Sequence, residues 1–199
     1  SEVIKIEKKV PELNNVYEDM IKSKKTDTLG YRGLMEQNLR NQDYHHAFLY
    51  GEKLFSINPN IEKLYDTLIF IAAKTKNWNQ IILLSDKAFS NKLINKNDLN
   101  ENKSVGFYEI AKIKYDSDIK DSLKNILKAV DLKKNFPPYV KLHLEIIAGL
   151  NNKRNLKKLI KKYWSLNPSS LLRSIIIKIL NDNDLTDVKF INEIIKNNA

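Results

Sequence analysis

Two segments of the sequence align position by position at an offset of 34 residues. The first is residues 41–55 and the second is residues 75–89. In both, a polar turn with Asp or Asn precedes an aromatic residue, Tyr44 or Trp78, and small or apolar residues follow at three- and four-residue spacing. This pattern predicts a helical hairpin whose second helix begins at the aromatic residue. A repeat of this length constrains the whole fold, because each hairpin buries its apolar face against the next one.

Two further hairpins follow from the same pattern, at about residues 105–134 and 139–168. In the first of them Asp118 takes the place of Asp43, and its second helix has a predicted core face of Leu123, Ile126, Leu127, Ala129 and Val130. Pro59 and Pro168 each follow an aromatic residue by four positions and an Asn by one, so both are expected to end a unit. The polar residues 92–103 are expected to form an inserted loop.

The two ends of the sequence are expected to differ from the middle. Residues 9–23 predict one amphipathic helix, whose apolar face consists of Val10, Leu13, Val16, Tyr17 and Met20. It resembles the second helix of a repeat whose first helix is missing. Apolar residues 171–180 and the segment 188–195 predict short capping helices. The expected organisation is therefore a partial leading helix in 1–28, three to four hairpins in 29–168, and capping helices in 169–199.

Composition supports an all-α fold and narrows the function. With five Gly and five Pro, the chain lacks the turn residues that strand-rich folds need. It has no cysteine, so disulfides and thiolate metal sites are excluded. No apolar run approaches the roughly 18 residues that span a bilayer, and the charged first residues do not form a signal peptide.

The chain resembles the tetratricopeptide repeat family in the length of its period and in the positions of Ala47, Phe55 and Pro59. Gly51, Leu54 and the Leu34-Met35 pair depart from the residues that this family prefers. The resemblance implies an all-α fold, a tetratricopeptide-like right-handed solenoid of antiparallel helical hairpins. It further implies a protein that binds other proteins and is not an enzyme.

A narrower resemblance covers residues 29 to about 172. The segment from Leu29 to Leu34, the long loop after Phe89, and the segment from Lys162 to Pro168 are similar to the C-terminal region of proteobacterial HemY-type proteins. That resemblance implies a repeat domain linked to haem or porphyrin biosynthesis. It further implies association with the bacterial inner membrane through a segment absent from this chain; otherwise the expected location is cytoplasmic. No catalytic residues come with it.

The sequence contains no recognisable catalytic, cofactor-binding or metal-binding motif. Adjacent residues His45 and His46 cannot form the i,i+4 pair of a helical metal site, and His143 is expected to be partly buried and hydrogen-bonded. The glycines at 30 and 33 lack the strand and the Lys-Ser/Thr of a phosphate loop. The chain is therefore predicted not to be an enzyme and to need no cofactor.

The net charge of +10 is concentrated in the second half of the chain. Six cations and no acid occupy residues 153–162, in two i,i+4 rows on one predicted helix face: Lys153, Arg154, Lys157, Lys158, Lys161 and Lys162. This face could contact anionic lipid, or it could be the solvated outer face of a repeat helix. Nucleic acid is the less favoured partner, because 30 of the 34 cations are Lys and Arg forks are scarce.

The first helix of each tetratricopeptide hairpin lines the concave surface, so alignment predicts a peptide groove. Its predicted residues are Arg32, Glu36, Leu39, Lys63, Asp66, Phe70, Phe107, Ala111, Lys114, Lys141, Glu145 and Ala148. Phe70 and Phe107 are the predicted apolar anchors. They could equally serve packing alone.

Three functional hypotheses follow. The first is a protein-binding scaffold, the soluble repeat region of a HemY-type protein. The second is a basic helical solenoid that binds an anionic membrane surface or nucleic acid. The third, and the least favoured, is an enzyme or a direct porphyrin carrier.

Overall fold

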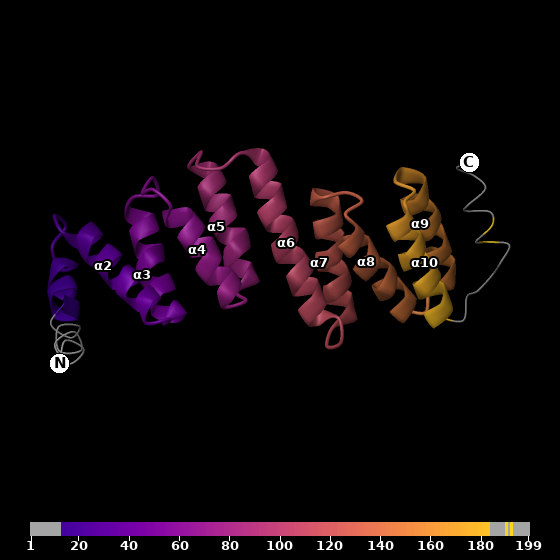
Figure 1. Cartoon of the computed structure of the whole chain (residues 1–199), viewed down its shortest axis with the longest axis horizontal. Helices are drawn as coiled ribbons and strands as arrows, with labels where there is room; N and C mark the ends of the chain where they lie inside the picture. Colours follow the sequence, from indigo (N-terminus) through magenta and orange to yellow (C-terminus); the bar gives the residue numbers. More distant parts are fainter. Residues whose placement is uncertain (1–12, 184–189, 191, 193–199) are drawn as a thin grey trace. The chain divides into compact units, whose positions relative to one another are not determined.

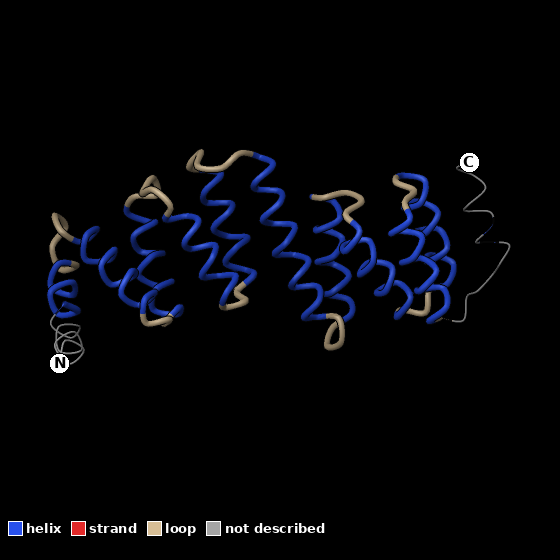
Figure 2. Tube along the Cα trace, viewed as in Figure 1, coloured by secondary structure: helices blue, strands red, loops and turns tan. Residues whose placement is uncertain are grey.

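The computed structural model describes residues 13–183 together with Phe190 and Asn192. Every regular element within this part of the chain is a helix (Figures 1 and 2). The helices are α2 (Asp27–Arg40), α3 (Tyr44–Ile57), α4 (Leu64–Lys74), α5 (Trp78–Ser90), α6 (Lys96–Lys114), α7 (Ile119–Leu132), α8 (Pro137–Gly149), α9 (Lys153–Leu166) and α10 (Ser170–Asp182). None of these described helices is both long enough and apolar enough to cross a bilayer.

The chain forms two compact units, Ser1–Lys96 and Asn97–Ala199. In the first unit, α2 packs against α3, α3 against α4, and α4 against α5. In the second unit, α7 packs against α8, α8 against α9, and α10 returns to pack against α8. Short turns join consecutive helices, so neighbours run antiparallel (Figure 2). The predicted fold class, an all-α tetratricopeptide-like solenoid of antiparallel hairpins, is confirmed.

The 34-residue repeat is visible in the backbone. Gln42 and Lys76 both adopt left-handed conformations, with φ of 59° and 55°, directly after the first helix of their hairpins. In both turns a backbone N–H reaches back five residues: Asp43 donates to Asn38 at 2.9 Å and Asn77 donates to Ala72 at 2.8 Å. This is the Schellman geometry, in which the last backbone carbonyl groups of a helix keep hydrogen-bond donors. The second helices then begin at Tyr44 and Trp78, as predicted.

Capping residues set the start of the second helices. The Asp43 side chain accepts from the His46 N–H, and the Asp118 side chain accepts from the Asp121 N–H. The predicted equivalence of Asp43 and Asp118 is therefore confirmed, because both are N-caps that satisfy an otherwise unpaired donor.

Three core clusters hold the hairpins together. One lies in the first unit and contains Met35, Leu54, Phe55, Leu64, Leu68, Leu84 and Ala88. Two lie in the second unit, one centred on Ala111, Ile126 and Tyr139 and the other on Leu144, Ile160 and Leu180. Gly51 allows α3 and α4 to approach closely, because a Cβ there would lie 2.8 Å from Leu68 and 2.9 Å from Met35.

The structure corrects the predicted loop at 92–103. The chain leaves helical conformation only at residues 91–95, and α6 begins at Lys96. Leu99 is 4% exposed and Ser104 is fully buried, so the first turns of α6 already have a packed side. The Asn, Lys and Asp residues around them lie on the solvent side of α6. Composition alone predicts a loop there, because it does not separate the two sides of a helix.

The predicted core face of α7 needs one correction. Ile126 and Ala129 are fully buried, whereas Leu127 is 47% exposed. Its place is taken by two polar residues: Ser122 donates to the Ala111 carbonyl at 2.7 Å, and Asn125 donates to the Asp121 carbonyl at 2.8 Å. Small hydrogen-bonded side chains can occupy a buried stripe because their polar atoms have partners.

The leading helix is described over residues 13–20; residues 9–12 of the prediction, with Val10, lie outside the described residues. Tyr17 and Met20 are half-buried, but Leu13 and Val16 are 43% and 53% exposed. The predicted apolar face is thus only partly covered. At the other end, α10 has 13 residues, as many as α8, so it is a full repeat helix and not a short cap. Of the predicted helix 188–195, only Phe190 and Asn192 are described, and both are helical.

Candidate functional site

A groove in the second unit runs across the first helices of its hairpins. Residues from α6, α8 and α10 enclose a hollow of about 460 Å³. Ile175 and the buried Ile179 form part of its floor, and Leu171 stands 55% exposed beside them. The full lining is Tyr108, Pro137, Pro138, Lys141, Glu145, Leu171, Ser174, Ile175, Lys178 and Ile179. The hollow is lined by apolar and charged side chains together.

Aromatic stacking positions the α6 side of the groove. The rings of Tyr108 and Tyr139 lie 4.8 Å apart, and the Tyr139 hydroxyl lies 3.1 Å from the hydroxyl of buried Ser104. Burial raises the pKa of both tyrosines, so they remain neutral hydrogen-bonding groups at physiological pH. Tyr108 therefore presents a ring that is held by the core and is still half-exposed to the groove.

Charges lie at the rim. Lys141 Nζ lies 3.7 Å from Glu145 Oε1, an i,i+4 pair along α8. Lys178 of α10 is exposed and takes part in none of the ion pairs within the described part of the chain. The groove thus combines an apolar floor with a net positive rim, which suits a segment carrying apolar and acidic side chains.

Six of the predicted groove residues lie in the first unit, and one of them, Leu39, is half-buried against its core cluster. Arg32 and Glu36 form an ion pair on α2, with Nε 2.9 Å from Oε1. Lys63 precedes α4 as its N-cap in left-handed conformation, and Asp66 lies in the first turn of that helix. Phe70 is 50% exposed, with an edge contact to Tyr44 at 6.4 Å. These six residues belong to α2, α4 and the turn before α4, and their role in binding stays a prediction.

In the second unit, Lys141 lines the groove, as does Glu145. Phe107 does not: it is half-buried against the cluster of Ala111 and Ile126, and Lys128 Nζ lies 4.8 Å from the centre of its ring. Lys114 is exposed in the last turn of α6 and is not part of the lining. The predicted Ala111 and Ala148 are buried in the core.

Sequence reasoning missed the aromatic and the whole α10 side of the groove. Tyr108, one position beyond Phe107, is the residue that faces it. Leu171, Ser174, Ile175 and Lys178 recur at three- and four-residue spacing, the pattern of a first helix lining a groove. The interpretation of 169–199 as a cap hid this pattern.

The predicted basic residues all lie on α9. Leu156, Ile160 and Tyr163 of this helix are buried, so its apolar face is packed as predicted. Lys153, Arg154, Lys158, Lys161 and Lys162 are exposed, whereas Lys157 is half-buried. The amino groups of Lys157 and Lys161 lie 5.1 and 5.6 Å from the centre of the buried Phe190 ring. The two i,i+4 rows therefore differ, because one of them also packs against Phe190.

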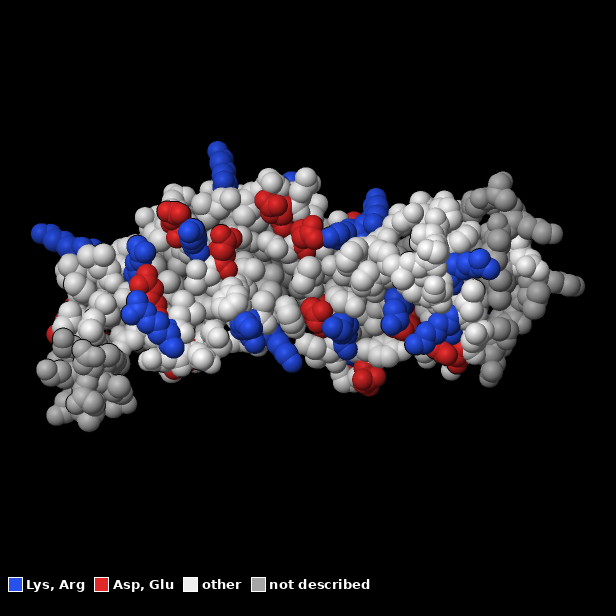
Figure 3. Space-filling view, in the orientation of Figure 1, with Lys and Arg blue, Asp and Glu red and all other residues white. Residues whose placement is uncertain are grey.

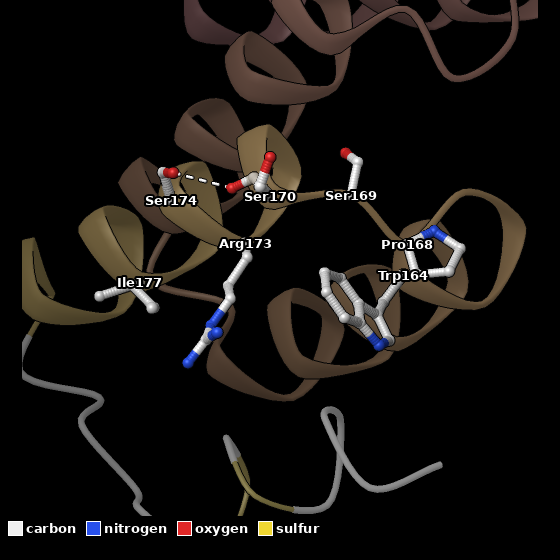
Figure 4. A pocket seen from close by; sticks show the side chains of 7 residues that line it. All are labelled: Trp164, Pro168, Ser169, Ser170, Arg173, Ser174 and Ile177. Carbon is white, nitrogen blue, oxygen red and sulfur yellow. Dashed lines mark hydrogen bonds between the residues drawn. The ribbon is translucent and has the colours of Figure 1, made fainter. Parts of the chain in front are cut away.

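A second hollow, of about 580 Å³, lies where α9 meets α10 (Figure 4). Trp164 and Arg173 project toward the same opening, and Ser169 and Ser170 lie at the start of α10. Both of these serines already have helical roles: the Ser169 hydroxyl accepts from the Leu172 N–H, and the Ser170 carbonyl accepts from Ser174.

His143 is buried, as expected, and its partner is Tyr163. Nδ1 of the histidine lies 2.7 Å from the tyrosine hydroxyl across the α8–α9 hairpin. Burial, with a smaller contribution from the charge of Lys162, lowers the pKa of His143 to about 4, and burial raises the pKa of Tyr163 to about 12. Both groups are neutral at pH 7, so this pair is a packing contact. Among the described residues, no group of three His, Cys, Asp or Glu side chains is placed to hold a metal ion.

A search of solved structures matches chains of low sequence identity. One is a MamA protein, 14% identical, with 85% of this chain and 90% of that chain covered and a TM-score of 0.46. Another is MamA from Desulfovibrio magneticus RS-1, 13% identical, covering 79% of this chain and 85% of that one, with a TM-score of 0.39. A third is YrrB, described as a TPR protein with an unusual peptide-binding site, 13% identical, covering 92% and 88%, with a TM-score of 0.42.

A scan against protein-family models gives no match, and a search of curated proteins gives none either. At such identities and TM-scores, no function passes from MamA or YrrB to this chain. The class of protein rests on its own helices: an all-α, tetratricopeptide-like protein in which each unit stacks antiparallel hairpins.

Proposed function

We propose that this chain is a non-catalytic protein-interaction module that binds a segment of a partner protein in the groove of α6, α8 and α10. The observation that carries the proposal is the hollow of about 460 Å³ with Leu171 exposed beside it. Its apolar side chains offer a site for an anchor residue, and the Lys141–Glu145 pair and Lys178 offer charged contacts around it.

Selection of 12-residue peptides from a random display library on the full chain tests the proposal. The selected peptides are then titrated against Leu171→Asp and against Leu127→Asp, a matched control on α7 whose side chain is 47% exposed outside the groove. We expect Leu171→Asp to weaken binding about tenfold or more, as for a buried anchor contact, and Leu127→Asp to leave it unchanged. Equal losses in the two variants, or peptides that bind both variants as well as the parent, would refute this site.

The finer assignment is also a proposal: that the chain is the repeat region of a membrane-anchored HemY-type protein linked to haem or porphyrin biosynthesis. It is supported only by the sequence resemblance at Leu29–Leu34 and Lys162–Pro168. It predicts that the natural gene encodes two apolar segments of roughly 20 residues upstream of Ser1. A gene without them rules this assignment out and leaves the groove proposal standing.

A further inference from the structure

The exposed side of α9 carries cations and no acidic side chain. Several lysines outside α9 lie beside carboxylates, as Lys87 does with Glu52, Lys112 with Glu109 and Lys133 with Glu101. On the face of the molecule shown in Figure 3, basic and acidic side chains are interspersed. Within the part of the chain that the structure describes, none of the ion pairs includes Lys153, Arg154, Lys158 or Lys162.

The geometry of α9 concentrates this charge. The helix is anchored by its buried face through Leu156, Ile160 and Tyr163, so its cationic side is held outward. At a rise of 1.5 Å per residue, the six cations from Lys153 to Lys162 lie within about 14 Å along the helix axis. The positive field reaches inward as well, since the charge of Lys162 contributes to the lowered pKa of His143.

One row of this face ends in an apolar side chain. Arg154, Lys158 and Lys162 recur every four residues, and the next position in the row is Leu166, which is 56% exposed. A row of cations that continues into an exposed leucine matches an anionic bilayer surface, where headgroups attract the cations and the interface accepts the apolar group. Nucleic acid offers no comparable site for leucine, and among the described residues the row of Arg154, Lys158, Lys162 and Leu166 contains no aromatic ring on which bases could stack.

We propose that the α9 basic face, defined by Lys153, Arg154, Lys158, Lys162 and Leu166, docks on an anionic lipid surface. The docking is peripheral, because the apolar face of α9 is already occupied by the core of the second unit. This surface is separate from the lining of the groove of α6, α8 and α10, so the two proposals are independent.

The test is co-sedimentation of the full chain with phosphatidylcholine vesicles, with and without about 30 mol% phosphatidylglycerol. We expect binding only to the anionic vesicles and release at ~0.5 M salt. Each cation near the surface contributes on the order of fivefold to partitioning, so Lys158→Gln should lower the partition coefficient about fivefold and replacement of all four cations by Gln several hundred-fold.

A matched control separates the α9 basic face from overall charge. Replacing the exposed lysines Lys24, Lys25, Lys53 and Lys92 by Gln makes the same change in net charge outside α9. We expect this control to retain near-parental binding, with circular dichroism showing that both variants are folded. Leu166→Ser should weaken vesicle binding severalfold and leave binding to a double-stranded DNA oligonucleotide or to poly-glutamate unchanged.

Three results would overturn the proposal. The first is absence of binding to anionic vesicles. The second is an equal loss in the α9 variant and in the control, which would show an effect of net charge alone. The third is binding to DNA or poly-glutamate that depends on the α9 cations while vesicle binding is insensitive to Leu166, which would assign the face to a different polyanion.

Discussion

Replacing Gly33 by alanine should destabilise the first unit, and the removal of one aromatic ring should reverse the sign of that effect. A Cβ at Gly33 would lie 2.4–2.5 Å from three ring atoms of Tyr17, far inside van der Waals contact. Overpacking of this kind costs about 1–3 kcal/mol. Alanine also favours the helix by about 1 kcal/mol over glycine. The expected net loss is therefore roughly 1 kcal/mol in the free energy of unfolding.

In a Tyr17→Ala background the clash disappears and only the helix preference remains. Gly33→Ala should then stabilise the chain by about 1 kcal/mol, so the double-mutant coupling is about 2 kcal/mol. Gly30→Ala is the contrasting control. Its Cβ would meet the backbone of the leading helix, 2.7 Å from the Tyr17 carbonyl oxygen and 2.9 Å from the Ile21 nitrogen. Truncating the Tyr17 side chain cannot relieve that clash.

The chain offers a convenient assay, because it has two tryptophans and they lie in different units. In a Trp164→Phe background, the fluorescence of Trp78 reports on the first unit during urea unfolding, and hydrogen exchange of residues 13–20 reports on docking of the leading helix. If Gly33→Ala has the same effect with and without the Tyr17 ring, or if Tyr17→Ala rescues Gly30→Ala equally well, this account of the two glycines is wrong.

Three further predictions concern pH and helix ends. The pKa of His143 is about 4 in the folded protein and 6.5 in the unfolded chain, so between these pH values only the unfolded chain gains a proton. The free energy of unfolding should therefore fall by up to roughly 3 kcal/mol as the pH drops from 6.5 to 4. In His143→Gln the free energy of unfolding should fall less over the same range. Urea titrations at several pH values check this, and identical profiles would contradict it. Lys76→Gly should stabilise the chain by roughly 0.5–1 kcal/mol, because glycine adopts the left-handed φ of 55° without strain; a lowered melting temperature would refute this. Asp118→Ala should cost about 1 kcal/mol by removing the cap to the Asp121 N–H, and Asp118→Asn should restore most of it, which thermal melts of both variants can test.

Local sequence patterns predicted the starts of the helices correctly in the segments that repeat. The alignment of residues 41–55 with 75–89 placed the starts of α3 and α5 at the correct residues, and Asp118 correctly marked the start of α7. N-caps and Schellman turns depend on a few adjacent residues, so the sequence alone can predict where they occur. The pairing of apolar residues at three- and four-residue spacing likewise identified the buried face of α9.

The groove could be predicted only in part. Alignment predicts Lys141 and Phe107 as groove residues and residues 169–199 as a cap, whereas the hollow is lined by Lys141, Tyr108 and residues of α10. One residue along a helix rotates a side chain by about 100°, so an error of one position moves it from groove to core. α6 also begins at Lys96, inside the segment 92–103 that polar composition predicts to be a loop.

By itself, the sequence determined the helical class, the hairpin period, the capping residues and the concentration of charge at residues 153–162, since each depends on neighbours within a few turns of helix. Only the tertiary structure decided which partners meet across helices. It brought Tyr163 to His143, Tyr17 to the two glycines of α2, and Leu171 to the groove beside Lys141. These contacts depend on how helices distant in sequence pack in space, and periodicity along one helix carries no information about the residue that faces it from another.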